Sequence, residues 1–477
     1  MMTNHTNHNA SPTAASFANI GLSIVSIWHS ISSCSLGTSL LLERQETLPI
    51  LTELLGGKRR NNKLLPTSNS MQSRIVLEGL GVFKNLTYYG EDHRYLIVQN
   101  AELMSTLTSL TVGGGTIFVG NNNDDGKSME RLSAVLRNLA LSSDVRGVMA
   151  RRSNVLTCLI KLASSGGGAY NNNAHRNVLR NITSTLSSLA MDGSSINLLL
   201  FHGDGMLVKQ LQHCLSTSDD AVVCKRAART VRLLAREEAS PAASLLHDPD
   251  LLSILSERAM HDANDGVRTE CQEAFARCAG LVRAPMEQYG AVLDALSNMA
   301  LNSTYTGTLV DNSNNHVTVS TGVSADIVTR ALREQAQHSE NRVVMVQRKE
   351  LVEGLANILS SPQASGLAKD NVCHTLLDLS KESSNHAAMA SSPAILGSIV
   401  NFLMERPAAN ESLTWTRMRE DIIRVVLNLA HTPSTREMLA SQTSMIQSLL
   451  QFASATSTNH DLKKKVKTAI LQLASAL

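Results

Sequence analysis

The stretch VGNNNDDGKS (119–128) ends in a Gly-Lys-Ser triplet, as does the phosphate-binding loop of nucleotide hydrolases. That loop needs four residues between its first glycine and the Gly-Lys pair, so that backbone N–H groups surround the phosphates. Here five residues separate Gly120 from Gly126. Two of them, Asp124 and Asp125, would place negative charge against a triphosphate. The spacing and the charge argue against a nucleotide site.

The other residues that could do chemistry are scattered along the chain. The seven cysteines include no Cys-x-x-Cys pair and no grouping with histidine at zinc spacing, which argues against a metal site. The histidines have no carboxylate or nucleophile at a recurring local spacing. The sequence therefore predicts no catalytic residue, no cofactor and no metal. Scattered thiols fit a reducing compartment, so we expect the protein in the cytoplasm, with the nucleus left open.

The composition indicates helices and excludes several classes of partner. Aromatic residues make up 3% of the 477 residues and prolines number 10, which favours helix-on-helix packing. The formal charge of +2 is too small to indicate binding to nucleic acid or to a membrane surface. The apolar stretch at 17–31 is too short to span a bilayer, and no Lys or Arg precedes it. We expect neither nucleic acid, membrane nor a small-molecule substrate as partner.

One sequence unit recurs along the chain. It has an apolar helical run that ends near Leu-Ala, a polar turn, an arginine about eight residues on, a short apolar helix, and a second helix with leucines at helical spacing. Four clear copies lie at 81–110, 134–163, 329–359 and 423–453. The turn arginines are Arg94, Arg146, Arg342 and Arg436.

A landmark position in the apolar run fixes the phase of this repeat. Its shortest recurrence is about 44 residues, and longer intervals carry insertions. The landmark residues are Asn85, Asn138, Ser188, Leu233, Arg277, Glu334, Asp378, Asn428 and Gln472. A degenerate earlier copy is expected at 29–55. The pattern predicts a disordered tail over 1–16, followed by a single solenoid over 17–477.

The insertions are predicted to be surface loops between one unit and the next. They are rich in Gly, Asn and Ser, which cannot pack a core. They are expected near 56–70, 112–126, 164–173, 302–322 and 405–415. The opening stretch is then the end of an insertion, with Asp125 or Ser128 as the N-cap of the next helix.

The repeat resembles the armadillo repeat, on the strength of the recurring Asn-Leu-Ala, the turn arginine and the following leucine helix. The related HEAT repeat is an alternative, because asparagine is missing from several landmarks. The resemblance implies an all-α, right-handed α-solenoid of about nine three-helix repeats, whose third helices carry the landmarks and line a groove for extended peptides. It also implies that the landmark asparagines Asn85, Asn138 and Asn428 bond the backbone of the peptide.

Basic residues recur on the expected third helices. Arg229, Arg232 and Arg236 share one helical face beside the landmark Leu233. The same kind of residue continues in later repeats at Arg277, Arg330, Arg333 and Arg424. Such a face favours acidic or phosphorylated segments. The alternative is that these arginines are solvated or pair with nearby glutamates, Glu334 among them.

The expected function is a non-enzymatic scaffold that binds extended protein segments. One alternative is a nucleocytoplasmic transport adaptor. The basic runs KRRNNK (58–63) and DLKKKVK (461–467) could be import signals, although solvated surface is the simpler interpretation of both. The tryptophan ladder of the import members of the family is missing, which argues against recognition of basic signals. A further alternative is a non-catalytic subunit of an enzyme complex.

Overall fold

The described part of the chain is helical, apart from two short strands. The computed structural model describes residues 12–56, 69–112, 123–164, 172–236, 245–282, 290–303, 308–310, 316–318, 325–405, 413–455 and 460–475. Contacts within the chain divide it into two compact units, unit 1 (Met1–Leu245) and unit 2 (Leu246–Leu477). The prediction of one uninterrupted solenoid over 17–477 stays a prediction.

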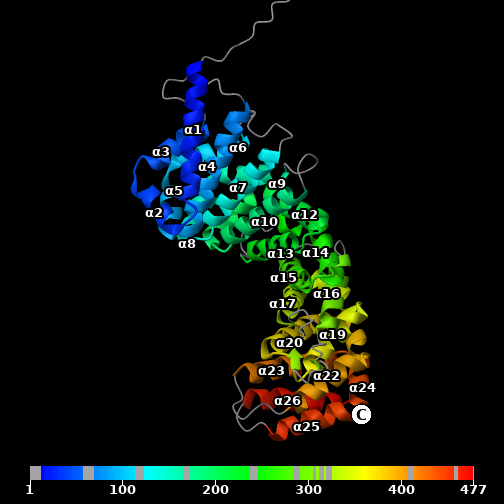
Figure 1. Ribbon diagram of the computed structural model, residues 1–477. Helices are drawn as coiled ribbons and strands as arrows, with labels where there is room; N and C mark the ends of the chain where they lie inside the picture. The colour runs from blue at the N-terminus through cyan, green and yellow to red at the C-terminus, as the bar shows by residue number, and fades with distance from the viewer. Residues whose placement is uncertain are drawn as a thin grey trace, which may run out of the picture. The chain divides into compact units, whose positions relative to one another are not determined.

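Unit 1 consists of stacked helical repeats (Figure 1). Its long third helices pack one against the next: α1 (Pro12–Ile31), α4 (Asn69–Tyr89), α7 (Asn123–Leu139), α10 (Asn172–Leu189) and α13 (Ala221–Leu234). Its second helices form the neighbouring layer: α3 (Thr47–Gly56), α6 (Ala101–Val112), α9 (Ser153–Ser164) and α12 (Met206–Thr217). Short first helices join them: α2 (Ser35–Glu43), α5 (Glu91–Gln99), α8 (Ser143–Ala150), and η1 (Gly193–Ser195) with α11 (Ile196–Phe201).

Unit 2 repeats the same arrangement (Figure 1). Its third helices are α15 (Asp265–Leu281), α17 (Ala325–Ala336), α20 (Gly366–Ser380), α23 (Leu413–His431) and α26 (His460–Ala474). Its second helices are α14 (Pro249–His261), α16 (Gly290–Asn302), α19 (Lys349–Ser360), α22 (Pro393–Met404) and α25 (Thr443–Ala455). Its short first helices are α18 (Ser339–Val346), η4 (Ser383–Asn385) with α21 (His386–Ala390), and α24 (Pro433–Ala440).

The turn arginine of the repeat caps the third helix that precedes it. Arg146 donates from Nε to Ala140 O at 3.0 Å and from Nη2 to Leu141 O at 3.0 Å. Arg94, Arg342 and Arg436 each make the same pair of bonds at the ends of their own third helices. The last carbonyl groups of a helix have no partner inside the helix, and a fork of cationic donors satisfies two of them at once. The recurring arginine is therefore explained by helix termination.

The core of each unit lies between the layers. The residue after landmark Asn138 is Leu139, which is completely buried at the end of α7. Cys271 and Cys278, two turns apart on α15, are also completely buried. Spacings of three, four and seven residues place such side chains on the packed face of a helix, so their burial follows from the sequence pattern.

Most of the predicted insertions fall outside the described residues, namely at 57–68, 113–122, 165–171 and 406–412. The run KRRNNK lies there as well, and so do residues 1–11 of the predicted tail. The predicted insertion at 302–322 contains a small antiparallel hairpin, β1 (Thr308–Val310) and β2 (His316–Thr318), with Leu309 opposite Val317.

Three predicted boundaries are wrong by a few residues. Helix α1 begins at Pro12, inside the predicted tail. Helix α7 begins at Asn123, so the Gly-Lys-Ser triplet lies within the helix, and the N-cap assigned to Asp125 or Ser128 is wrong. Helix α23 begins at Leu413, inside the predicted insertion. In α7 the residues Asn123 to Gly126, which favour turns, belong to the helix, because tertiary packing outweighs the small differences in helix propensity.

Candidate functional site

The landmark asparagine Asn138 is buried on α7, with 1% of its surface exposed. Its Nδ2 donates to Lys84 O at 3.2 Å and to Thr87 Oγ1 at 3.3 Å, both on the preceding third helix α4. Its Oδ1 accepts from Arg137 Nη2 at 3.1 Å. These contacts tie one repeat to the next. Binding of a peptide by Asn138 stays a prediction, and the burial of its side chain counts against that prediction.

The other two landmark asparagines are half-buried and also bond backwards. Asn85 donates to Ser32 Oγ at 3.1 Å, and Asn428 donates to Ser380 Oγ at 3.0 Å. Ser32 follows α1 and Ser380 ends α20, so each bond again joins consecutive third helices. Both asparagines keep some exposed surface, and their role in peptide binding stays a prediction.

The predicted basic residues of unit 1 lie on α13 or just after it. Arg229 and Arg232 are half-buried, and Arg236 is exposed in the turn after the helix. Arg229 Nε is buried without a hydrogen bond to any described residue. In unit 2, Arg277 is half-buried on α15. The binding role of these arginines stays a prediction.

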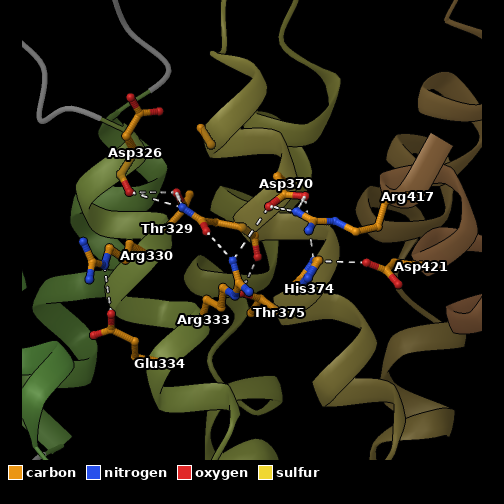
Figure 2. Close-up of polar contacts among 12 residues, drawn as sticks. Asp326, Thr329, Arg330, Arg333, Glu334, Asp370, His374, Thr375, Arg417 and Asp421 are labelled. Carbon is orange, nitrogen blue, oxygen red and sulfur yellow. Dashed lines mark hydrogen bonds and ion pairs between the residues drawn. The ribbon is translucent and has the colours of Figure 1, made fainter. Parts of the chain in front are cut away.

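Of the remaining predicted arginines of unit 2, Arg333 and Arg424 belong to a network of charges across α17, α20 and α23, and Arg330 lies beside it on α17. Figure 2 shows the part of this network around Asp370. Asp370 on α20 is at its centre, and 6% of its side chain is exposed. Arg417 Nη2 donates to Asp370 Oδ1 at 2.7 Å and to Oδ2 at 2.8 Å. Arg333 Nη1 lies 3.7 Å from Asp370 Oδ2. One buried carboxylate thus holds guanidinium groups from two neighbouring repeats, and its hydrogen bond raises the pKa of Arg417.

A second buried carboxylate, Asp421 on α23, extends the network toward the C-terminus. His374 Nδ1 lies 3.1 Å from Asp421 Oδ2, and Arg424 Nη1 lies 3.7 Å from Oδ1. Burial raises the pKa of Asp421 above its ordinary value, while the charges of His374 and Arg424 act in the opposite direction.

Glu420 lies at the C-terminal end of the network. Arg424 Nη2 donates to Glu420 Oε1 at 2.6 Å, and Lys465 on α26 bonds the same oxygen. The hydrogen bond from Lys465 lowers the pKa of Glu420. On α17, Arg330 Nε donates to Glu334 Oε1 at 3.0 Å, which is the pairing that the sequence offered as an alternative to ligand binding.

The acids and the bases of this network differ in exposure. The side chains of Asp370 and Asp421 are 6% exposed, whereas those of Arg417 and Arg424 are 55% and 46% exposed. The carboxylates therefore lie beneath the guanidinium groups and hold them at the surface. We call the set Arg330, Arg333, Arg417 and Arg424 the arginine face of unit 2. It can offer cationic, forked donors to an anionic ligand in a fixed arrangement.

Four members of the network were missed by sequence reasoning: Asp370, Arg417, Glu420 and Asp421. The local signal for them is weak, because Asp370 and Arg417 are far apart in sequence and meet only when α20 packs against α23. A search for opposite charges one repeat apart on successive third helices could have found the pair.

Other kinds of site are not evident in the described residues. No group of three or more His, Cys, Asp or Glu side chains there could hold a metal ion. No single helix among them is long and apolar enough to cross a membrane. One pair, Ser383–Ala390 with Pro393–Met404, meets the length and composition criteria together, but it is bent by 83°.

Comparison with known proteins supports the fold. No family model matches the sequence, and no curated protein matches it. The crystal structure of the SYS-1/POP-1 complex matches with a TM-score of 0.58 at 11% sequence identity, over 98% of this chain and 83% of that one. The crystal structure of She4p matches with a TM-score of 0.47 at 11% sequence identity, over 97% of this chain and 66% of that one. Together with the repeat, the first match shows that the fold is that of a divergent armadillo-type solenoid.

Proposed function

We propose that the protein is a non-enzymatic scaffold that binds acidic, extended segments of partner proteins on the arginine face of unit 2. The observation that carries the proposal is the burial of Asp370 and Asp421 beneath half-exposed Arg417 and Arg424. Free arginine side chains lose conformational entropy when they bind, and a guanidinium group already held by a carboxylate loses less.

The geometry also suggests how a segment would lie. Arg333, Arg417 and Arg424 come from α17 and α23, on either side of α20, so an anionic segment that contacts them would run across the third helices. A row of carboxylates along an extended chain matches cationic groups that recur once per repeat. The resemblance of the fold to that in the SYS-1/POP-1 complex, which contains two proteins, supports the choice of a protein partner.

The cysteines of the chain bear on the cellular compartment of the protein. All seven cysteines are unpaired, and six of them are buried. This use of cysteine supports a reducing environment, and we propose the cytoplasm.

The test measures the binding of fluorescein-labelled oligoglutamate to the full chain by fluorescence anisotropy, at low and at physiological salt. We expect binding that weakens with salt, and that falls about tenfold or more in the double variant Arg417→Gln with Arg424→Gln. Arg348→Gln is the matched control, because Arg348 pairs with Asp294 of the second-helix layer at 3.1 Å. The control removes one positive charge and the double variant removes two. If the control therefore lost about half as much binding free energy as the double variant, only the net charge of the protein would attract the probe, and the proposal would fail.

A further inference from the structure

The third helices of both units share a polar framework. In unit 2, Arg333 Nη1 donates to Asn371 Oδ1 at 3.2 Å. The amide nitrogen of Asn371 in turn donates back to α17, to Asp326 O at 3.5 Å and to Thr329 Oγ1 at 3.4 Å. This framework places Asp370, the residue next to Asn371, beside Arg333.

Unit 1 contains the same framework. Arg137 Nη1 donates to Asn181 Oδ1 at 3.0 Å. The amide nitrogen of Asn181 donates back to α7, to Glu130 O at 3.5 Å and to Ser133 Oγ at 3.1 Å. The residue next to Asn181 is Arg180, where unit 2 has an aspartate.

The charges on the two frameworks are therefore different. Asp370 lies eight residues before its landmark Asp378, and Arg180 lies eight before Ser188. Asp421 lies seven residues before Asn428, and Arg226 lies seven before Leu233. The positions that hold two buried carboxylates in unit 2 hold two arginines in unit 1, beside an arginine (Arg333 or Arg137) that both units share.

The positive charge at this place in unit 1 is only partly balanced. Arg180 Nε donates to Asp220 Oδ2 at 2.8 Å, and Arg176 Nε lies 3.6 Å from the same oxygen. Asp220 is also the N-cap of α13. Arg226 Nη1 donates to the main-chain oxygen of Arg180 at 2.8 Å, and Arg137 is held by amide oxygens. Within the described residues, neither Arg137 nor Arg226 has a carboxylate at ion-pair distance.

The electrostatic consequence is visible at Arg226. Burial lowers its pKa, and the charges of Arg137 and Arg180 lower it further, while Asp220 acts in the opposite direction. Arg137 and Arg180, on the helices α7 and α10, are thus close enough to Arg226 on α13 to disfavour its positive charge. Arg137 and Arg226 are held by neutral oxygens and only Arg180 by a carboxylate, so the cluster keeps an excess of positive charge that stabilises an anion.

We propose that Arg137, Arg180 and Arg226 bind the phosphate group of a phosphorylated serine or threonine in a partner protein. A phosphate carries about two negative charges and three acceptor oxygens, and so supplies the charge that Asp370 and Asp421 supply in unit 2. The site is confined to three neighbouring helices, whereas a nucleic acid is bound along an extended track with aromatic side chains for its bases. The site is separate from the arginine face of unit 2, and either can fail without the other.

The test measures the binding of three fluorescein-labelled pools of degenerate peptides to the full chain. The pools differ at one fixed position, which is phosphoserine, serine or glutamate. We expect tight binding of the phosphoserine pool alone, competition by inorganic phosphate, and affinities about tenfold or more lower in Arg180→Gln and in Arg226→Gln. Circular dichroism checks that each variant is folded, and Arg226→Lys, which keeps a charge but not the fork, should bind at an intermediate level.

Two control variants test whether binding depends on these three arginines. Arg151→Gln removes an exposed arginine of the same unit and should leave binding unchanged. The double variant of Arg417 and Arg424 should also bind the phosphoserine pool normally. Equal binding of the serine pool, or unchanged binding in both Arg180→Gln and Arg226→Gln, overturns the proposal. Binding of phosphatidylserine vesicles through the same arginines, without binding of peptides, overturns the assignment to a protein segment.

Discussion

Replacement of Asn138 by alanine separates a structural role of the landmark asparagine from a role in ligand binding. The change removes two donated bonds to α4, at 3.2 Å and 3.3 Å, each worth about 1 kcal/mol in net stability. It also removes the oxygen that accepts from Arg137, a charge-assisted bond that is worth about 1 kcal/mol once the partial exposure of the guanidinium group is considered. We therefore expect the free energy of unfolding of unit 1 to fall by about 3 kcal/mol.

The two tryptophans make this change measurable for one unit at a time. Trp28 lies in unit 1 and Trp415 in unit 2, so a Trp415→Phe background reports unit 1 alone by fluorescence. For a unit of this size the free energy of unfolding falls by about 3 kcal/mol per molar of urea. The urea concentration at the midpoint of unfolding should therefore fall by about 1 M. Asn85→Ala, which loses one bond to Ser32, should shift it by about a third as much. If Asn138→Ala left the midpoint unchanged and weakened peptide binding instead, the structural role of Asn138 would be refuted.

Three further predictions concern the core, the charged network and the thiols. Leu139→Ala should destabilise unit 1 by about 2–5 kcal/mol in urea unfolding, because a completely buried side chain leaves a cavity; a loss below about 1 kcal/mol would contradict the packing. Glu420, whose pKa is lowered chiefly by Lys465, contributes stability above its ordinary pKa of 4.5, and that stability is lost as the pH falls through the lowered value. Glu420→Gln should therefore lower the stability of unit 2 near neutral pH and flatten its acid dependence, and an unchanged pH profile would contradict the pairing. Cys34 is exposed whereas burial raises the pKa of Cys158 to about 12, so mass spectrometry after native alkylation should find Cys34 modified and Cys158 intact.

Much of the fold could be predicted because its signals are local and repeated. The leucine spacing defines helices, and the turn arginine recurs because each third helix needs its last carbonyl groups satisfied. In the repeat of Asp378, His386 takes the place of the arginine and its Nε2 bonds Ser380 O at 2.9 Å. The sequence pattern of the turn arginine is missing from this repeat because a histidine makes the same contact.

The candidate site could be predicted only in part. The sequence places Arg330, Arg333 and Arg424 on third helices, as the structure does, but periodicity does not show which charges meet across repeats. The pairing of Asp370 with Arg417 depends on the packing of α20 against α23 and on the start of α23 at Leu413, inside a stretch whose composition indicates a loop. Whether buried carboxylates lie beneath the exposed arginines depends on how the helices pack, and no single helix shows it.

The most direct test of ligand binding by the arginine face is arginine footprinting of the full chain with phenylglyoxal and mass spectrometry, with and without oligoglutamate. We predict that the ligand slows modification of Arg333, Arg417 and Arg424 and leaves that of Arg348 unchanged, because only the first three belong to the third-helix face of unit 2. Equal protection of all four arginines, or protection of Arg348 alone, would contradict binding at this face.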